Sequence, residues 1–163
     1  MYNNYVQHTP VLLNEALDLL APKPGETVID VTLGLSGHAA KFLERIGSKG
    51  KLVGIDADEK NLAEARKKLA GKNIVLIHGN FRDLPLLLSQ AGIKSCDILF
   101  ADLGLSSPHL DDPERGFSFR TDAPLDLRFD QTQGESASNL LCNAQEEQLL
   151  RIFREYGELP DAR

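Results

Sequence analysis

Apolar residues occur along the chain in short runs that alternate with amphipathic stretches. The runs predict buried strands over 28–31, 51–56, 73–78 and 97–103. Between them, helical spacing of apolar positions predicts helices over 38–46, 59–70 and 84–91. Short connections between alternating strands and helices indicate right-handed βαβ units and a parallel sheet with helices on its faces. The pattern therefore predicts an α/β fold.

A further helix is predicted at each end of this pattern. Over 9–20, Thr9 is the expected cap and Pro10 the first helical residue. The chain from 104 to 142 is polar and rich in turn residues, and it holds no convincing strand. A last helix is predicted over 143–156, because Asn143 and Glu146 form a pattern like a capping box. Its apolar stripe is Leu149, Ile152, Phe153 and Tyr156.

Composition narrows the class of protein. A chain of 163 residues with 42% hydrophobic and 26% charged residues is typical of a globular domain with a sizeable core. No apolar run approaches the ~20 residues of a membrane span, and the first residues do not resemble a signal peptide. Cys96 and Cys142 lack metal-ligand spacing, so we expect a reducing compartment, buried thiols and no disulfide. A net charge of -6 disfavours binding of nucleic acid by the whole surface and leaves a local basic patch possible.

Candidate chemistry lies after the strands, because an open parallel sheet binds its ligand beyond the carboxyl ends of its strands. After the first strand, "DVTLGLSGH" contains Gly34 and Gly37, which suit either a ligand or a plain turn. This spacing is not G-x-G-x-x-G, which argues against a dinucleotide. After the second strand, Asp56 suits ribose hydroxyls or a helix cap, although Asp58 could be that cap. Together these features favour a ligand that contains a nucleoside.

The next two strands are followed by an aromatic ring and a carboxylate. Phe81 suits stacking on an adenine or an ordinary place in the core. Asp102 follows a strand of apolar residues, so its carboxylate must be solvated or paired, which indicates a site; a loop-holding hydrogen bond is the alternative. His38 and His109 are candidate general bases or ligand contacts. No His or Cys pair has zinc-site spacing, so we expect no metal.

One segment after the fourth strand, 114–130, mixes aromatic and charged residues. Stacking rings interleaved with cations suit single-stranded RNA. The acids in the same segment outnumber the arginines, so a salt-bridged lid is an equal alternative. The side chains concerned are Phe117, Phe119, Phe129, Arg115, Arg120, Arg128, Glu114, Asp122, Asp126 and Asp130.

Several stretches together resemble one family, the MraW/RsmH-type small-subunit (16S) ribosomal RNA (cytosine-N(4))-methyltransferases. They are "HTPVLLNEAL", "DVTLGLSGH", "GIDAD", "HGNF" and "DLGLSSPHLDDPERGFSFRTDAPLDLRFD". The last is long and unlike other methyltransferases. The resemblance implies a Rossmann-like sheet with strand order 3-2-1-4 followed by the start of a helical insertion. It also implies S-adenosyl-L-methionine as cofactor, a cytidine amino group of small-subunit RNA as substrate, and a cytoplasmic protein.

The resemblance also implies roles for particular residues. Asp102 matches the family's acid after the fourth strand, and our hypothesis is that its carboxylate accepts a hydrogen bond and a proton from the substrate amino group, with Ser106 and Ser107 as helpers. Val31, Ser36 and His109 depart from the residues usual in the family. The implied cofactor contacts are Gly34, Ser36, Gly37, His38, Asp56, Phe81, Asp102 and His109.

The resemblance further suggests how the chain is organised. We expect a cofactor-binding domain over 1–110, a lid loop over 111–135 and the start of the helical insertion over 136–163. The fourth strand is apolar on both faces, yet nothing after it can pair with its edge, which invites another chain. We therefore expect a second copy or a missing C-terminal half to complete the sheet. Two other functions stay open, an inactive cofactor-binding module of the same family and a nucleotide-dependent oxidoreductase.

Overall fold

The computed structural model describes residues 10–162 and divides the chain into two compact units, one ending at Ser106 and one beginning at Ser107. The predicted cap Thr9 lies outside the described residues. The predicted lid loop and helical insertion both fall within the second unit, and their roles stay predictions.

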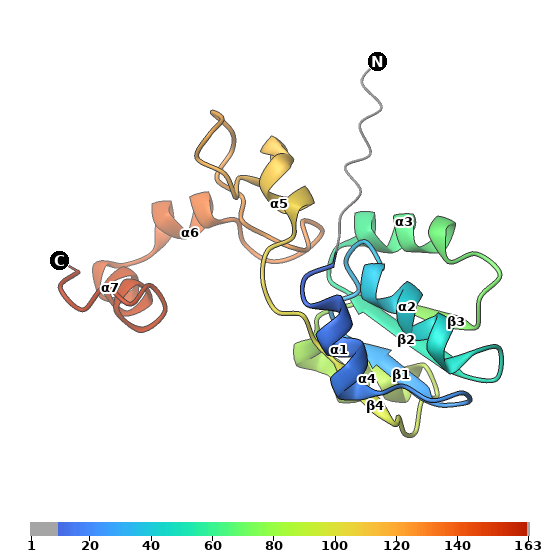
Figure 1. Cartoon of the computed structure of the whole chain (residues 1–163). Coiled ribbons are helices and arrows are strands. Elements are labelled where there is room, and N and C mark those ends of the chain that lie inside the picture. The colour runs from blue at the N-terminus through green and yellow to red at the C-terminus, as the bar shows by residue number, and fades with distance from the viewer. Residues whose placement is uncertain (1–9, 163) are drawn as a thin grey trace, which may run out of the picture. The chain divides into compact units, whose positions relative to one another are not determined.

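A four-stranded parallel sheet forms the centre of the first unit (Figure 1). Its strands are β1 (Thr27–Asp30), β2 (Lys51–Asp56), β3 (Ile74–His78) and β4 (Ile98–Phe100). The strand order is β3-β2-β1-β4, which confirms the predicted α/β fold and the order 3-2-1-4. All strands point the same way, so their carboxyl ends meet at one edge of the sheet.

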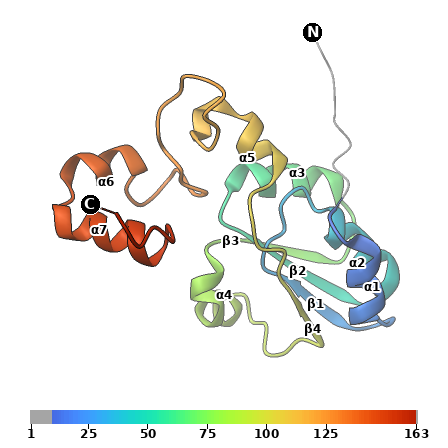
Figure 2. The ribbon, with the colours of Figure 1, turned by 60° about the vertical axis from the view of Figure 1, so that its left-hand side comes forward.

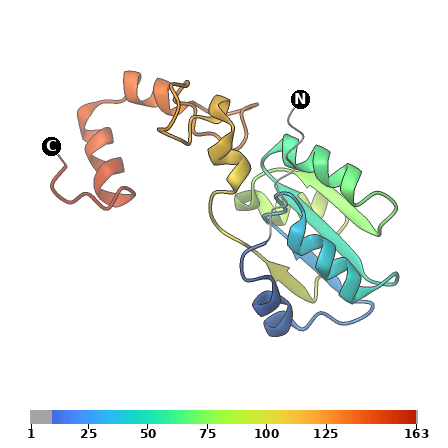
Figure 3. The same ribbon diagram turned by 45° about the horizontal axis from the view of Figure 1, so that its top comes forward.

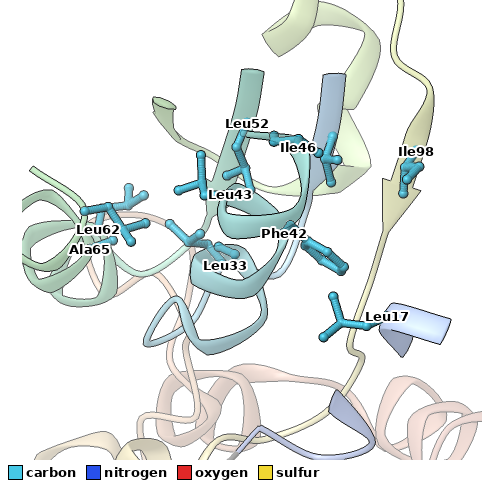
Figure 4. Close-up of a cluster of buried hydrophobic side chains, with 12 residues drawn as sticks. Leu17, Leu33, Phe42, Leu43, Ile46, Leu52, Leu62, Ala65 and Ile98 are labelled. Carbon is cyan, nitrogen blue, oxygen red and sulfur yellow. The ribbon is translucent and has the colours of Figure 1, made fainter. Parts of the chain in front are cut away.

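Helices cover both faces of this sheet, as alternating strands and helices predict. On one face lie α1 (Leu13–Leu20), α2 (Gly37–Ile46) and α3 (Glu59–Lys68), over a core that includes Phe42, Leu52 and Leu62 (Figure 4). On the other face, η1 (Phe81–Asp83) leads into α4 (Leu84–Gln90), which packs near β2 and β3 (Figure 2). The predicted apolar stripe of α3, Leu62, Ala65 and Leu69, is buried.

Strand β4 lies at an edge of the sheet within the described residues (Figure 3). It is shorter than predicted, ending at Phe100, two residues before Asp102. Ile98 and Phe100 pack on the core beneath α1 and α2, whereas Leu99 points to the opposite face and is 53% exposed. An apolar side chain is thus left uncovered on the edge strand, as expected for a strand that suits a central position.

The second unit contains α5 (Ser107–Asp111), η2 (Pro113–Arg115), α6 (Ala137–Asn143) and α7 (Glu146–Glu155). Rings of His109, Phe117 and Phe129 pack together with centroids 4.8 to 5.7 Å apart. Helix α7 begins after Gln145, and Asn143 instead ends α6, so the predicted capping box is wrong.

Two other predictions are corrected by the structure. Helix α1 begins at Leu13 rather than at residue 9, because Leu12 has a left-handed conformation with φ 52° and breaks the helix before it. Cys96 and Cys142 are free thiols as expected, but both are exposed rather than buried. Cys96 lies in the loop before β4 and Cys142 on an exposed face of α6, so neither reaches the core.

Across residues 10–162, no helix combines the length and the apolarity needed to cross a membrane.

Candidate functional site

The loops that follow the four strands lie at the carboxyl edge of the sheet, where the sequence predicts the site. Asp30 and Asp56 are the last residues of β1 and β2. Pairing of Asp56 with His78 and of Asp30 with Phe100 brings all four strand ends to this edge. The predicted site residues of the first unit therefore follow neighbouring strands of one sheet.

The glycine turn after β1 is held by hydrogen bonds to its backbone. Gly34 has φ +51°, and its amide donates to Asp56 Oδ2 at 2.7 Å. Ser36 is buried with φ +59°, a left-handed conformation that favours glycine. Its hydroxyl donates to the carbonyl oxygen of Leu35 at 2.7 Å. The side chain that departs from the family pattern is thus bonded within the turn.

Gly37 opens α2 and has a steric reason to be glycine. A Cβ atom at this position would lie 2.3 Å from Cγ of Pro10. The close approach of Pro10 therefore requires a residue without a side chain. The same contact places the segment before α1 against the start of α2.

Asp56 has its carboxylate directed into the glycine turn and the start of α3. Its Oδ1 accepts from the amide of Asp58 at 2.8 Å, and its Oδ2 accepts from Asn61 Nδ2 at 3.2 Å as well as from Gly34. The cap of α3 is Asp58, which accepts from the amide of Lys60 at 2.9 Å. The sequence left Asp56 as either a contact for ribose hydroxyls or the cap of α3, and the structure excludes its being the cap.

Asp30 ends β1 at the candidate site, and the sequence analysis gave it no role. Its side chain is 1% exposed and accepts from the amide of Thr32 at 3.1 Å. Burial raises the pKa of Asp30 to about 7, against the lowering effect of Thr32, and the charges of Asp56 and Asp102 raise it further. The sequence does contain a signal for Asp30, because Asp30 is a carboxylate at the end of an apolar strand, which is the argument that indicated Asp102.

Asp102 lies in the loop beyond β4, and its side chain is half exposed. Its main-chain amide donates to Thr32 Oγ1 at 2.7 Å. The carboxylate is thus solvated, as the sequence reasoning required, while its backbone is attached to the loop after β1. Three acids, Asp30, Asp56 and Asp102, interact electrostatically at this edge. Such a concentration of negative charge suits a cationic ligand.

His38 lies between the glycine turn and Asp102. Its Nε2 lies 3.0 Å from the carbonyl oxygen of Val11, and its Nδ1 lies 3.9 Å from Asp102 Oδ2. The ring is buried and packs against two aromatic rings, stacked at 6.4 Å from Phe42 and tilted at 4.8 Å from Phe100 between centroids. His38 therefore contacts the segment before α1 and lies near the loop after β4.

A cavity of about 300 Å³ opens beside these residues. Its walls are α1, with Glu15 as the acidic side chain, and the end of β4. His38, Phe100 and Asp102 line it from the sheet side. A largely apolar hollow with a few polar groups is the usual form of a small-molecule site.

Phe81 begins η1 directly after β3 and is 47% exposed. The ring is therefore not part of the core, which excludes the alternative in which Phe81 is an ordinary core residue.

Ser106 is half-buried at the end of the first unit, whereas Ser107 and His109 belong to the second unit. The cofactor or catalytic roles of these residues stay predictions. Among residues 10–162, no cluster of three or more His, Cys, Asp or Glu side chains is arranged to hold a metal ion.

The segment with interleaved rings and arginines uses most of its charges internally. Arg115 is buried and donates to the carbonyl oxygen of Phe129 at 3.2 Å. Arg128 binds both carboxylate oxygens of Asp126, at 2.9 and 2.7 Å, and thereby holds the pKa of that carboxyl below its ordinary value. These contacts favour the salt-bridged alternative over a basic RNA-binding surface. Phe119 is fully exposed and Phe129 is 40% exposed, and Arg120 is the exposed guanidinium of this segment.

Solved structures confirm the fold. TrmN from Thermus thermophilus superimposes with a TM-score of 0.52 at 24% identity, over 61% of this chain and 30% of that protein. A protein-L-isoaspartate O-methyltransferase superimposes with a TM-score of 0.50 at 19% identity, over 64% and 33%. The fold is therefore that of the Rossmann-like methyltransferases.

Sequence relatives identify the family. Ribosomal RNA small subunit methyltransferase H of Syntrophotalea carbinolica is 44% identical over 160 residues, which is 97% of this chain and 51% of that protein. The protein of the same name from Trichlorobacter lovleyi is 47% identical over 153 residues, or 93% and 49%. The profile of the MraW methylase family matches residues 5–163, so the chain belongs to this family, as its sequence resemblance predicted. The chain spans about half the length of these curated relatives.

Proposed function

We propose that the chain binds S-adenosyl-L-methionine and transfers its methyl group to the N(4) amino group of a cytidine in small-subunit (16S) ribosomal RNA, in the cytoplasm. Membership of the MraW methylase family and relatives named as small-subunit ribosomal RNA methyltransferases support this proposal. The observation that carries it is the position of Asp102, beside the cavity and near the acids that end β1 and β2.

The residues present suit this cofactor. Asp56 and Phe81 follow β2 and β3, where a carboxylate suits ribose hydroxyls and an exposed ring suits adenine. The turn over 34–37 suits the amino-acid end of the cofactor, and the acids at the edge suit the positive charge of the cofactor. When bound, the cofactor supplies an electrophilic methyl group.

Asp102 has the central chemical role in this proposal. The amino group of cytosine is a poor nucleophile, because its lone pair is delocalised into the ring. A carboxylate that accepts a hydrogen bond from this amino group localises the lone pair and removes a proton as the nitrogen reacts. Ser106, Ser107 and the backbone that follows Asp102 would help to orient the base. Placing the nitrogen correctly can supply much of the rate.

The cytosine must leave its base stack to reach Asp102. The cavity between α1 and the end of β4 is large enough for a flipped base, and its walls are mainly apolar. A second copy of the chain, or the other half found in the longer relatives, would cover β4. Leu99, exposed on that strand, supports this part of the proposal.

The test compares the wild-type chain with Asp102→Asn. Calorimetry measures binding of S-adenosyl-L-methionine, and a methylation assay on small ribosomal subunits measures transfer. We expect both activities in the wild type, and a rate lower by about 10²-fold or more in Asp102→Asn. Asp18→Asn, an exposed acid on α1, is the matched control and should keep the wild-type rate.

Three other outcomes would contradict the proposal. A near-normal rate in Asp102→Asn would remove the role of this residue. Cofactor binding by the wild type without transfer would support an inactive cofactor-binding module. Binding of a nicotinamide dinucleotide instead of S-adenosyl-L-methionine would support an oxidoreductase.

A further inference from the structure

The hydrogen bond between His38 and Val11 determines where the imidazole carries its proton. Nε2 lies 3.0 Å from the carbonyl oxygen of Val11. A carbonyl oxygen only accepts, so Nε2 must be the donor. In the neutral imidazole, Nδ1 then has a lone pair and no proton. The bond to Val11 thus leaves Nδ1 ready to accept a proton.

Nδ1 is directed at the acid proposed to react. It lies 3.9 Å from Asp102 Oδ2. A neutral imidazole nitrogen and a carboxylate oxygen are both acceptors, so the pair can share one proton between them. Packing of the ring against Phe42 and Phe100 holds it in this orientation. The side chain of Asp102 is half exposed, and catalytic hydrogen bonds that are long in a free enzyme often shorten when the substrate binds.

We propose that His38 is a positioning residue that accepts, through Nδ1, the proton that Asp102 removes from the substrate amino group. This inference rests on the proposed function. It differs from the role implied by the family resemblance, in which His38 contacts the cofactor. In this role the His38 ring acts on the reaction only through its partner Asp102.

The proton and electron balance of the step is complete. The amino nitrogen bonds to the methyl carbon as the carbon–sulfur bond breaks, and the electron pair of that bond stays on sulfur. The nitrogen releases a proton to the Asp102 carboxylate, which passes it to Nδ1 of His38 and becomes ionised again. The imidazolium then loses its proton to water in the cavity that His38 and Asp102 line.

The substitution His38→Gln separates this role from a structural one. The amide nitrogen of Gln takes the place of Nε2 and can still donate to Val11, but Gln offers no basic nitrogen to Asp102. We expect an unchanged melting temperature, an unchanged dissociation constant for S-adenosyl-L-methionine and an unchanged KM for small ribosomal subunits. We expect kcat to fall by about 10²-fold. Lys41→Gln, on the exposed side of α2, is the matched control and should keep wild-type kcat.

Two results with His38→Gln would overturn the inference. Wild-type kcat would show that His38 only joins α2 to the segment before α1. Loss of cofactor affinity at unchanged kcat would show that His38 contacts the cofactor instead.

A second measurement needs no catalysis. Nitrogen-15 NMR of the histidine-labelled chain, without cofactor, reports which ring nitrogen of His38 is protonated. We expect a protonated Nε2 and an unprotonated Nδ1 in the neutral ring, and a changed Nδ1 signal in Asp102→Asn. The opposite tautomer, or an Nδ1 signal that ignores Asp102→Asn, would overturn the inference even if the chain methylates RNA. Absence of methyl transfer by a wild-type chain with the expected NMR signals would instead contradict the proposed function.

Discussion

The main-chain amide of Asp102 donates a hydrogen bond of 2.7 Å to the hydroxyl oxygen of Thr32. The two residues are 70 positions apart in the chain and follow the adjacent strands β1 and β4. The loop that carries the proposed catalytic acid is therefore attached to the loop that begins the glycine turn. Thr32 also donates its own amide to Asp30, so one residue contacts two of the three acids.

Thr32→Val should loosen Asp102 while keeping the shape of the side chain. Loss of one hydrogen bond lowers the free energy of unfolding by about 1 kcal/mol. A displaced Asp102 should lower kcat roughly tenfold. Thr32→Ser keeps the hydroxyl and is the control that should retain wild-type kcat. Urea unfolding and the methylation assay measure the two effects, and equal kcat in both variants would contradict the role of this bond.

Asp30 should make the stability of the chain fall as the pH rises. Its pKa is about 7 in the folded protein and 3.8 ordinarily, so between these values the folded state binds the proton more tightly than the unfolded state does. The stability that this proton contributes is complete below pH 4 and is lost as the pH rises through 7. The shift corresponds to roughly 4 kcal/mol at most.

Asp30→Asn removes this ionisation and keeps an oxygen that can accept from Thr32. The variant should match the wild type near pH 4 and exceed its free energy of unfolding at pH 8. Urea unfolding across this pH range measures the difference. Asp18→Asn, at an exposed position, should follow the wild-type curve. A wild-type curve parallel to that of Asp30→Asn would show that the carboxyl does not titrate as expected.

Ser36→Gly should stabilise the first unit. Ser36 has φ +59°, and a left-handed conformation is costly for any residue with a Cβ atom. Loss of the hydroxyl bond and the extra freedom of glycine when unfolded offset part of the gain, which leaves about 0.5 kcal/mol. Gly34→Ala, at φ +51°, should do the reverse and lower the free energy of unfolding by about 1 kcal/mol. Thermal unfolding followed by circular dichroism compares the two; a destabilised Ser36→Gly would mean that the hydroxyl bond outweighs the backbone strain.

Replacing Phe119 and replacing Phe117 by alanine should have very different effects on the free energy of unfolding. Phe119 is 100% exposed, so Phe119→Ala should change the free energy of unfolding by less than about 0.5 kcal/mol. Phe117 packs on His109 and Phe129, so Phe117→Ala should cost about 2 kcal/mol. If Phe119 stacks on a base of the substrate, Phe119→Ala should also weaken binding of small ribosomal subunits severalfold. Unchanged binding of small ribosomal subunits would show that the Phe119 ring does not contact the substrate.

Much of the first unit was predictable because its signals are local. The strand that carries Asp56 begins and ends as its apolar run predicts, and α3 buries the stripe that its spacing indicates. Helix α1 was predicted too long, because the segment before it depends on contacts of Pro10 with Gly37, which follow β1. The strand order came from the family resemblance, since local patterns do not determine which strands are neighbours.

The second unit and part of the site depend on contacts that local patterns do not contain. Helix α6 has no apolar period, and it begins where Ser136 accepts from the amide of Asn139. The burial of Asp30 requires helices and loops from distant parts of the chain. Arg115 and Phe119 belong to one motif, yet the first is buried and the second is fully exposed, a difference that only folding decides.

The two exposed thiols have a practical consequence for spectroscopy. Cys96 belongs to the first unit and Cys142 to the second, and the chain has no other cysteine. Without any engineered residue, a fluorescent donor and acceptor attached to these sulfur atoms would report the separation of the two units. Energy transfer recorded while S-adenosyl-L-methionine and then RNA are added would follow that separation through the proposed reaction.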